Sequence, residues 1–598
     1  MKRLWIIGLC VSLLWGCSNA PGDETIATLS PTETVAVTLP DMSQMFTDRD
    51  HRTEYDSNPV TISLEGDSAS GGNGHVKISK NTVTITGEGT YILTGQLNGM
   101  VMVDADSSHK LQLVLDNATI HNESSAAIYV KQADKVFITL AEGSANALSV
   151  GESFTAIDDN NIDSAIFSKD DLTINGKGSL SVICPGGHGI VSKDDLVLTG
   201  GKYTINCAGH GLDANDSLRT TGVSMSITAG KDGIHAENTD DAALGYVYLE
   251  KSDFTVSAEG DGISAGSTLQ VSGGQFTITS GGGAINAEKP SSDFYGGFGG
   301  FGGGRPGKGE KPQPTQQPTT ESQSMKGMKA VGDLNIYDGT FQMDCADDGF
   351  HSNANVTVHA GTFTIATGDD GFHADENMNI LGGKIQVTES YEGVEGLHIA
   401  ISGGDLKLTC ADDGINAAGG TDESGFGGFG GFGGFGGGRG DQFGGRPGGG
   451  FGGHGGGNGS ITISGGTIYM NASGDGIDAN GTLTVSGGHV TICGPTRGDT
   501  SVLDYDKTAT ITGGSFIGTG STMMAQSFSE NTQGVLALKT GNCIAGTQIT
   551  VTDAKGNTIL DYAPILDFGL LVLSTPDIVS GETYTVTMDG QSYDFTAN

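Results

Sequence analysis

A glycine-centred motif recurs along the chain at a nearly constant interval. It consists of glycine, an apolar residue, a small or polar residue, and alanine or serine, as in GLDA at Gly211 and GIHA at Gly233. Gly189, Gly211 and Gly233 follow one another at intervals of 22 residues, and Gly371 follows Gly349 at the same interval. A fixed period of this length indicates a repeat architecture in which each repeat packs only on its neighbours.

Two short alternating segments separated by a glycine pair follow each motif. Leu269–Ile278 reads LQVSGGQFTI, and Leu483–Ile492 reads LTVSGGHVTI. The alternation puts apolar side chains on one side of each strand, and three short strands per repeat fit stacked parallel strands. Parallel crossovers are right-handed in nearly all proteins. The sequence therefore predicts an all-β fold, a right-handed parallel β-helix or solenoid with ~22 residues per coil, closed by a small C-terminal β cap.

The first residues indicate where the protein is located. Lys2 and Arg3 precede an apolar run that is too short to span a bilayer and that ends at Cys17. This pattern predicts a bacterial lipoprotein signal peptide, with lipidation at Cys17 and the body of the protein on the extracellular face of the membrane. An ordinary signal peptide is the alternative.

Composition shifts divide the rest of the chain into segments. Thr, Ser and Pro are frequent before the repeats, and two tracts rich in Gly and Phe interrupt them. Because the long interruptions start shortly after Gly283 and Gly414, we expect both to leave from the same corner of the repeat. The predicted segments are a signal peptide (1–17), a tether (18–59), the repeat domain (60–520), two insertions (290–324 and 420–459) and the cap (521–598).

The charge balance restricts the possible partners. The chain has 70 Asp and Glu against 30 Lys and Arg, a formal net charge of −40. Nucleic-acid binding needs clustered basic residues and is therefore excluded. The surplus of carboxylates favours cations, or ligands that are reached through cations.

Carboxylates recur in the positions next to the motif glycines. Equivalent positions of successive repeats should lie about one strand spacing apart, where two carboxylates repel by roughly 3.5 kcal/mol at an effective dielectric constant of 20. Calcium would relieve this repulsion, because it binds six to eight oxygen atoms. The predicted metal ligands are Asp347, Asp348, Asp369, Asp370, Asp375, Glu392, Glu395, Asp412, Asp413 and Asp475.

One alternative weakens the calcium prediction. Asp-Gly is ordinary turn chemistry, so the column could be solvated without metal. A second column earlier in the chain is a weaker candidate for metal, because Lys169 and Lys193 could neutralise its charge. Its members are Asp170, Asp171, Asp194, Asp195 and Asp216.

Motifs of polysaccharide-degrading enzymes are incomplete. His188 and His210 each lie in a Gly-His-Gly tripeptide like that of polygalacturonase-type glycosidases, but the R-I-K element of that site is absent. A calcium-dependent lyase would need a basic residue as the catalytic base. Lys231, Lys329 and Arg497 lie near repeat corners, and nothing in the sequence singles one out.

Six cysteines follow the signal region, and several occupy one repeated position. Cys184 and Cys207 are about one repeat apart and could be in contact, whereas Cys345 and Cys410 are too far apart for a disulfide. Because no C-x-x-C motif is present, zinc is not expected. We interpret these residues as small buried side chains.

Three stretches of the sequence resemble a known family. Ser125–Gly143, Ser164–Val182 and the D-D-G-[IF]-[HN]-[AS] turns are similar to the carbohydrate-binding β-helix surface proteins of cellulolytic clostridia. The resemblance covers roughly residues 60–500. It implies a calcium-containing protein that binds cellulose-like or acidic polysaccharides and has no established catalytic activity.

The sequence therefore predicts a monomeric cell-surface lipoprotein that binds polysaccharide through a calcium-bearing repeat domain. A polysaccharide lyase or glycoside hydrolase on the same scaffold is the first alternative. A structural or adhesive stalk without catalytic activity is the second.

Overall fold

The computed structural model describes residues 44–55, 57–287, 324–418, 458–495 and 500–598. Met45–Asn598 form one compact unit. The signal peptide, Cys17, most of the tether and nearly all of the two insertions lie outside the described residues. Within the described ranges, no helix combines the length and the apolarity that a membrane span requires.

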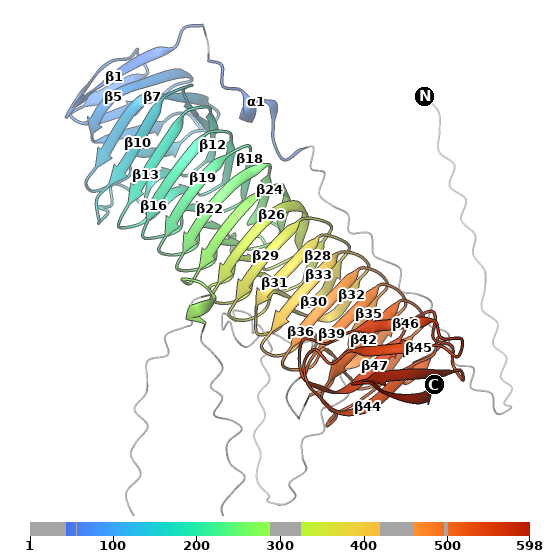
Figure 1. Ribbon diagram of the computed structural model, residues 1–598. Helices are drawn as coiled ribbons and strands as arrows, with labels where there is room; N and C mark the ends of the chain where they lie inside the picture. The colour runs from blue at the N-terminus through green and yellow to red at the C-terminus, as the bar shows by residue number, and fades with distance from the viewer. Residues whose placement is uncertain (1–43, 56, 288–323, 419–457, 496–499) are drawn as a thin grey trace, which may run out of the picture. The chain divides into compact units, whose positions relative to one another are not determined.

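The 22-residue period sets the register of the strands. Tyr203 pairs with Met225, and Phe350 pairs with Phe372, in parallel ladders. Each repeat supplies one strand to each of three such ladders, which run side by side (Figure 1). The sequence-based prediction of which residues lie next to one another is confirmed.

The first ladder begins directly after the motif glycines. Its strands are β4 (Thr82–Ile85), β6 (Met100–Asp104), β8 (Ile128–Gln132), β11 (Ser164–Ser168), β14 (His188–Ser192), β17 (Leu212–Ala214), β20 (Ile234–Ala236), β23 (Ile263–Ala265), β25 (Met328–Ala330), β27 (Phe350–Ser352), β30 (Phe372–Ile380), β32 (Val394–Ile401), β34 (Ile415–Ala417), β37 (Ile477–Ala479) and β40 (Leu503–Tyr505).

The second ladder follows the first along the chain and includes part of β30 and of β32. Its other strands are β1 (Val60–Gly66), β5 (Gly89–Asn98), β7 (Lys110–Asn122), β9 (Lys135–Leu140), β12 (Asp171–Gly176), β15 (Asp195–Thr199), β18 (Ser217–Thr221), β21 (Tyr246–Glu250), β24 (Leu269–Ser280), β26 (Leu334–Cys345), β28 (Asn355–Val358), β35 (Gly459–Ile463), β38 (Gly481–Val485), β41 (Thr508–Ile511) and β43 (Glu530–Asn531).

The third ladder includes part of β7, β24 and β26. Its other strands are β10 (Ala145–Val150), β13 (Ser179–Cys184), β16 (Lys202–Cys207), β19 (Ser224–Ala229), β22 (Ser252–Ala258), β29 (Thr362–Thr367), β31 (Lys384–Glu389), β33 (Asp405–Cys410), β36 (Thr467–Ala472), β39 (His489–Cys493) and β42 (Ser515–Gly520).

The predicted fold class has to be corrected. The sequence predicts a β-helix whose coils are built from separate short strands, but long strands such as β24 and β26 each pair in two ladders. The ladders consequently merge into one 45-stranded sheet. This sheet closes around the core as a parallel barrel with additional strands, and the predicted β-helix solenoid is wrong in this respect. The cause is local: Gly273 and Gly274 have positive φ angles, yet the chain keeps pairing through them, with Ser252 opposite Gly274.

The core lies inside this closed wall. Apolar side chains from all three ladders are buried there, and the aromatic ones form columns. The rings of Phe276, Phe341 and Phe363 stack with centroid separations of 5.0 and 4.7 Å. Offset stacking of this kind adds to the hydrophobic gain from burial.

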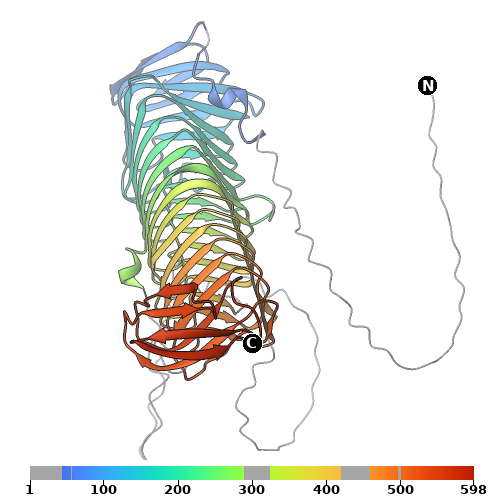
Figure 2. The ribbon, with the colours of Figure 1, turned by 45° about the vertical axis from the view of Figure 1, so that its right-hand side comes forward.

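Antiparallel strands occur at both ends of the wall. Strands β2 (Ala69–Gly71) and β3 (Val76–Ser79) pair antiparallel with β1 and β4. At the other end β47 (Phe568–Ser574) pairs antiparallel with β42 and β44 (Leu536–Cys543). A separate antiparallel sheet lies at the same end of the chain (Figure 2). Its strands are β45 (Ile549–Thr552), β46 (Thr558–Tyr562), β48 (Thr583–Met588) and β49 (Gln591–Thr596). Apolar side chains of this sheet form one buried cluster with side chains of β44 and β47.

A short helix, α1 (Asp48–His51), fastens the beginning of the compact unit to the outer side of the second ladder. Asp50 is 1% exposed, and its carboxylate lies 3.1 Å from Lys135 Nζ and accepts a hydrogen bond from Thr173. Burial would raise the pKa of Asp50, but these partners lower it to about 2.

The two long insertions leave the wall at different corners, which corrects the expectation of a shared corner. Gly283 precedes a short 3-10 helix, η2 (Ala284–Asn286), and no wall strand follows it directly. The equivalent motif glycine is Gly327, because β25 pairs with β23 and β27. The first insertion therefore precedes its motif, whereas the second follows β34.

Candidate functional site

Two neighbouring columns of side chains follow the motif glycines along the wall. In column A, the residue before each motif glycine accepts a backbone hydrogen bond from the glycine of the preceding repeat, as Asp370 does from Gly349. In column B, the residues two positions after each glycine pair in register. We call the two columns together the acidic strip. Column A contains Asp232, Asp261, Lys326, Asp348, Asp370, Glu392, Asp413 and Asp475, and column B contains Asp213, His235, Ser264, Lys329, His351, His373, Glu395, Asn416, Asp478 and Asp504.

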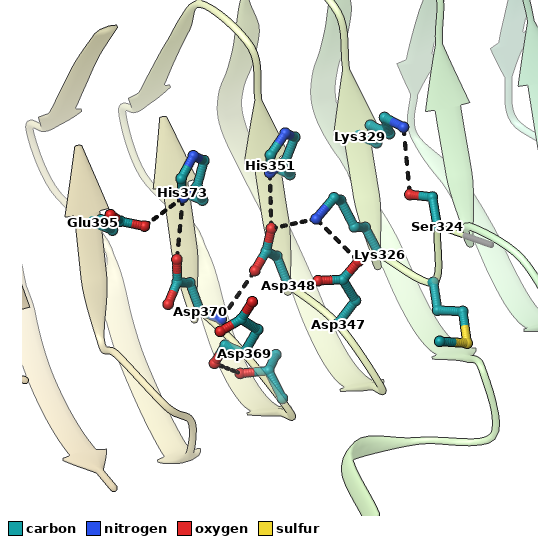
Figure 3. Close-up of polar contacts among 12 residues, drawn as sticks. Ser324, Lys326, Lys329, Asp347, Asp348, His351, Asp369, Asp370, His373 and Glu395 are labelled. Carbon is teal, nitrogen blue, oxygen red and sulfur yellow. Dashed lines mark hydrogen bonds and ion pairs between the residues drawn. The ribbon is translucent and has the colours of Figure 1, made fainter. Parts of the chain in front are cut away.

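In the middle of the strip, a lysine neutralises two of the predicted metal ligands. Lys326 is 2% exposed, and its Nζ lies 2.7 Å from Asp348 Oδ2 and 3.0 Å from Asp347 Oδ2 (Figure 3). Asp348 also accepts hydrogen bonds from the ring of His351 at 2.8 Å and from the backbone N–H of Asp370 at 3.0 Å. The ammonium group lies between the two carboxylates and balances part of their charge.

One repeat further along, a histidine has the same role. His373 Nδ1 lies 2.7 Å from Glu395 and 3.1 Å from Asp370, and its Nε2 lies 3.1 Å from Asp375. Because ionised carboxylates only accept hydrogen bonds, both ring nitrogens carry protons and the ring is cationic. We call Lys326, Asp347, Asp348, His351, Asp369, Asp370, His373, Asp375 and Glu395 the central cluster.

The pKa values of Asp348, His373 and His351 reflect this internal compensation, whereas burial and neighbouring carboxylates raise the pKa of Asp370 well above its ordinary range. Burial disfavours the charge of Asp348, but the Lys326 ammonium and the His351 hydrogen bond hold its pKa well below the ordinary range. Burial also opposes the charge of His373, yet its carboxylate partners raise its pKa. Burial and the nearby Lys326 charge lower the pKa of His351 to about 4, so this ring is neutral at pH 7.

Further along the strip, three carboxylates approach one another without such a partner. Asp413, Asp475 and Asp478 have carboxylate oxygens within 4.8 Å of one another, and we call them the C-terminal acidic cluster. The backbone N–H of Asp475 donates to Asp413 Oδ1 at 2.5 Å, and that of Ser501 donates to Asp475. Across the described parts of the chain, no lysine, arginine or histidine forms an ion pair with these three residues.

Their pKa values shift in the direction opposite to that of Asp348. Burial, followed by the charge of Asp475, raises the pKa of Asp413 to about 8. Burial and neighbouring carboxylates raise the pKa of Asp475 to about 7 and that of Asp478 to about 6. The cluster is therefore costly to ionise in the absence of a cation.

A buried amide oxygen next to this cluster fits a cation site. Asn416 pairs in register with Asp478 and is 7% exposed. Its Nδ2 donates to Glu392 at 2.9 Å, while its Oδ1 has no hydrogen-bond partner among the residues that the structure describes. Carboxylate and amide oxygens are the donor set that calcium prefers, so the C-terminal acidic cluster fits a hard divalent cation.

The remaining predicted ligands lie around these two clusters. Asp369 is close to Asp347 and Asp348, with oxygens within 4.8 Å. Burial, then the charge of Glu395, raises the pKa of Glu392 well above its usual range, and Asn416 is its hydrogen-bond donor. Asp412 lies beside Asp413 and takes part in the hydrogen bonding of the next repeat, since its carbonyl accepts from Gly474.

Basic residues other than the predicted ones neutralise the second predicted column. Arg219 forms an ion pair with Asp195, and Lys135 lies 4.0 Å from Asp171. Lys193 lies 3.7 Å from Asp213, which belongs to the acidic strip. Burial and the charge of Asp171 raise the pKa of Asp194 to about 7.

The histidines of the Gly-His-Gly tripeptides belong to the start of the strip. The rings of His188 and His210 stack at 4.9 Å, and those of His210 and His235 stack at 4.3 Å. His235 Nδ1 lies 2.9 Å from Asp213, and His210 Nδ1 lies 3.3 Å from Asp232. These contacts indicate that the histidines stabilise the stacking of neighbouring repeats.

Sequence reasoning missed Lys326, His351, His373, Asn416 and Asp478 as members of the site. His351, His373, Asn416 and Asp478 each lie two residues after a motif glycine. Aligning the repeats by these glycines would have shown polar side chains at this position in successive repeats. Lys326 was hidden because the long insertion separates its repeat from the preceding one.

The two cysteines that we expected to be in contact lie opposite each other in adjacent strands. Cys184 and Cys207 are Cα partners in neighbouring parallel strands. Both are buried free thiols, as are Cys345, Cys410 and Cys493. Cys207 donates to the carbonyl oxygen of His210 at 3.2 Å.

Comparisons with known proteins place the chain in a family. The sequence profile of carbohydrate-binding domain-containing proteins matches residues 79–371. A carbohydrate-binding domain-containing protein of Acetivibrio thermocellus is 42% identical over 216 residues, which are 36% of this chain and 76% of the relative. A solved structure, the gadolinium derivative of a polysaccharide lyase-like protein from C. thermocellum, is 34% identical, with a TM-score of 0.37 over 38% of this chain and 92% of that one. The chain belongs to the family of carbohydrate-binding domain-containing proteins.

Proposed function

We propose that this protein is a cell-surface polysaccharide-binding protein without catalytic activity, and that calcium bound at the C-terminal acidic cluster links it to acidic polysaccharides. Family membership supports binding of carbohydrate in general. The observation that carries the calcium proposal concerns the described residues: three carboxylates approach one another without a basic partner there, and Asn416 Oδ1 beside them has no hydrogen-bond partner there.

Calcium would have two effects at this site. It would relieve the repulsion between Asp413, Asp475 and Asp478, and it would take Asn416 Oδ1 as a further oxygen ligand. Because these ligands lie at a corner of the wall, a bound ion could share its remaining positions with carboxylates of a glycan. A protein with a formal net charge of −40 needs such a bridge to hold an acidic polymer.

The proposed location is supported by the lipoprotein-like pattern that ends at Cys17. A lipid on Cys17 would hold a monomer at the extracellular face, where cellulose-like or acidic plant polysaccharides are accessible. This part of the proposal rests on the sequence alone.

The lyase alternative requires a lysine that is available as a base. Lys329 Nζ lies 3.4 Å from Ser324 Oγ and 3.9 Å from Asp261 Oδ2, so it is partly engaged in the acidic strip. Lys326 is fully engaged by Asp347 and Asp348. These contacts argue against Lys326 and Lys329 as the catalytic base.

Retention on polygalacturonate with and without EDTA tests the proposal. We expect retention in calcium, release in EDTA, and no unsaturated products or new reducing ends in the wash. Retention that EDTA leaves unchanged would refute the calcium bridge. Appearance of cleavage products would replace the binding proposal with the lyase or hydrolase alternative.

A further inference from the structure

We propose that Lys326 and Asp348 form an amide bond in the folded protein, so that a covalent link joins two neighbouring repeats of the wall. The bond joins Nζ of Lys326 to Cγ of Asp348 and releases one water molecule. The ion pair described above is the form that precedes this bond. The inference concerns the protein's own side chains, and it depends neither on carbohydrate nor on calcium.

The two reacting groups are held in contact and away from water. Lys326 is 2% exposed and Asp348 is 0% exposed, and Nζ lies 2.7 Å from Asp348 Oδ2. Groups fixed in contact within one molecule react as if their concentration were as high as about 10⁵–10⁸ M. Amide formation at this site therefore has a large advantage over the same reaction between separate molecules in water.

A second carboxylate is placed to move the protons of this reaction. Oδ2 of Asp347 lies 3.0 Å from the same Nζ of Lys326, and Asp347 is also buried. It can accept a proton from the nitrogen during the attack and then return that proton to the leaving oxygen. Asp347 would thus act first as a general base and then as a general acid.

Both oxygens of Asp348 lie next to an N–H group. Oδ1 accepts a hydrogen bond from the backbone N–H of Asp370 at 3.0 Å, and Oδ2 lies 2.8 Å from Nδ1 of His351 (Figure 3). The backbone N–H would stabilise the negative charge that develops on Oδ1 during the attack, as in an oxyanion hole. His351 would hold Oδ2, the oxygen that leaves as water. These two contacts select Asp348 as the acyl group.

The reaction balances without an oxidant or a cofactor. One proton passes from the Lys326 ammonium to Oδ2 of Asp348 along their contact, which gives an amine and a carboxylic acid. The amine attacks Cγ, a second proton travels from Nζ through Asp347 to Oδ2, and the Cγ–Oδ2 bond breaks to release water. The amide has no charge, whereas the two opposite charges that it replaces are costly to keep away from water.

Another buried ion pair of the protein lacks the second carboxylate in contact. Lys135 Nζ lies 3.1 Å from Asp50 Oδ1, but the next carboxylate, that of Asp171, is 4.0 Å away and 31% exposed. No group equivalent to Asp347 therefore touches the nitrogen of Lys135 among these three residues. We expect this pair to stay ionic, and it serves as the internal control.

The bond would fasten the wall where the chain returns to it after the first insertion. Lys326 comes shortly before β25, Asp348 comes shortly before β27, and these two strands are parallel neighbours. The link would prevent β25 from separating from β27 at this corner.

Peptide mapping of the purified full chain by mass spectrometry tests the inference. Trypsin cleaves after free lysines, so cleavage after Lys326 and Lys329 separates both of them from Asp348. An amide at Lys326 blocks cleavage there and leaves its peptide joined to the peptide that contains Asp348, with a combined mass lower by one water molecule. We expect most of the folded protein to give this joined peptide, and Lys135 and Asp50 to appear in separate peptides.

Three variants test the assigned roles. Lys326→Arg keeps the positive charge without an amine and should give no joined peptide. Asp347→Asn keeps both reacting groups but removes the base, so the joined peptide should become at least about tenfold less abundant. Lys135→Arg is the matched control and should leave its abundance unchanged.

The map of the unmodified protein decides the inference even if a variant fails to fold. Separate peptides of full mass in the unmodified protein would overturn the inference. A joined peptide of undiminished abundance in Asp347→Asn would overturn the mechanism, because the second carboxylate would then have no part in the reaction.

Discussion

The central cluster and the C-terminal acidic cluster occupy the same columns of the same wall, but their charges are balanced in opposite ways. Asp348 lies against Lys326 and His351, and its pKa is lowered. Asp475 occupies the equivalent position near the other end of the strip, lies against Asp413 and Asp478, and has its pKa raised to about 7. The repeat thus determines which carboxylates lie close together. The residues in the adjacent repeats determine whether a basic side chain of the protein balances their charge.

The largest expected effect follows from removing the internal cation of the central cluster. Lys326→Met would leave Asp347 and Asp348 close together and buried without their shared ammonium group. Breaking a buried ion pair in this way costs about 3–5 kcal/mol. The free energy of unfolding, measured by urea denaturation with and without calcium, should fall by this amount in the metal-free protein. A variant as stable as the unmodified protein would show that the two clusters do not differ as described.

A smaller effect is expected from adding calcium to the unmodified protein. An ion that binds only the folded state stabilises it by about 2.7 kcal/mol when its concentration is 100 times the dissociation constant. We expect calcium to raise the melting temperature, and Asp413→Asn to abolish most of the rise because it removes one of the three clustered carboxylates. Asp375→Asn, in the central cluster, is the control and should keep the rise. An equal rise in both variants would place the ion elsewhere.

In the metal-free protein, the C-terminal acidic cluster should make the free energy of unfolding depend on pH. This effect should be smaller than the two before it. The pKa values of Asp413, Asp475 and Asp478 are raised in the folded state to about 8, 7 and 6, so their contribution to stability is complete below pH 4 and is lost as the pH rises to about 8. Between low and high pH, the free energy of unfolding of Asp475→Asn should therefore fall by about 1–2 kcal/mol less than that of the unmodified protein. Melting curves at pH 5 and pH 8 in EDTA measure it, and parallel pH profiles of the two proteins would refute the assignment.

The smallest effect is expected at the edge of the central cluster. Lys329 lies 3.9 Å from Asp261, and its side chain is 25% exposed. Asp261 is buried, but it also accepts hydrogen bonds from Ser324 Oγ and from the backbone N–H of Lys326, both at 2.7 Å. Because its contact with Lys329 is long, Lys329→Met should change the free energy of unfolding by no more than about 1 kcal/mol. Urea denaturation beside Lys326→Met gives the contrast directly. A loss as large as that of Lys326→Met would mean that burial does not distinguish the two lysines.

The sequence was sufficient to predict the register of the acidic strip. The 22-residue spacing of Gly349 and Gly371 placed Asp348 beside Asp370, and the backbone N–H of Asp370 indeed donates to the Asp348 carboxylate. It was not sufficient to identify the partner of Asp348. Lys326 follows the first insertion, and the motif at Gly327 was assigned to Gly283 instead, so the internal cation was overlooked.

The fold class could be predicted only in part. The strands and their parallel pairing follow from the alternation of apolar residues, as in Leu269–Ile278. Whether a strand ends or continues at a glycine pair depends on pairing with the neighbouring repeat, and β24 continues through Gly273 and Gly274. Closure of the ladders into one barrel wall depends on such continuations, which a single sequence does not reveal.

Calcium titration by isothermal calorimetry tests the difference between the clusters most directly. The unmodified protein and Asp375→Asn should bind calcium with the same stoichiometry, whereas Asp475→Asn should lose one ion per chain. Unchanged calcium binding by Asp475→Asn would contradict the account, because the uncompensated carboxylates would then have no role as ligands.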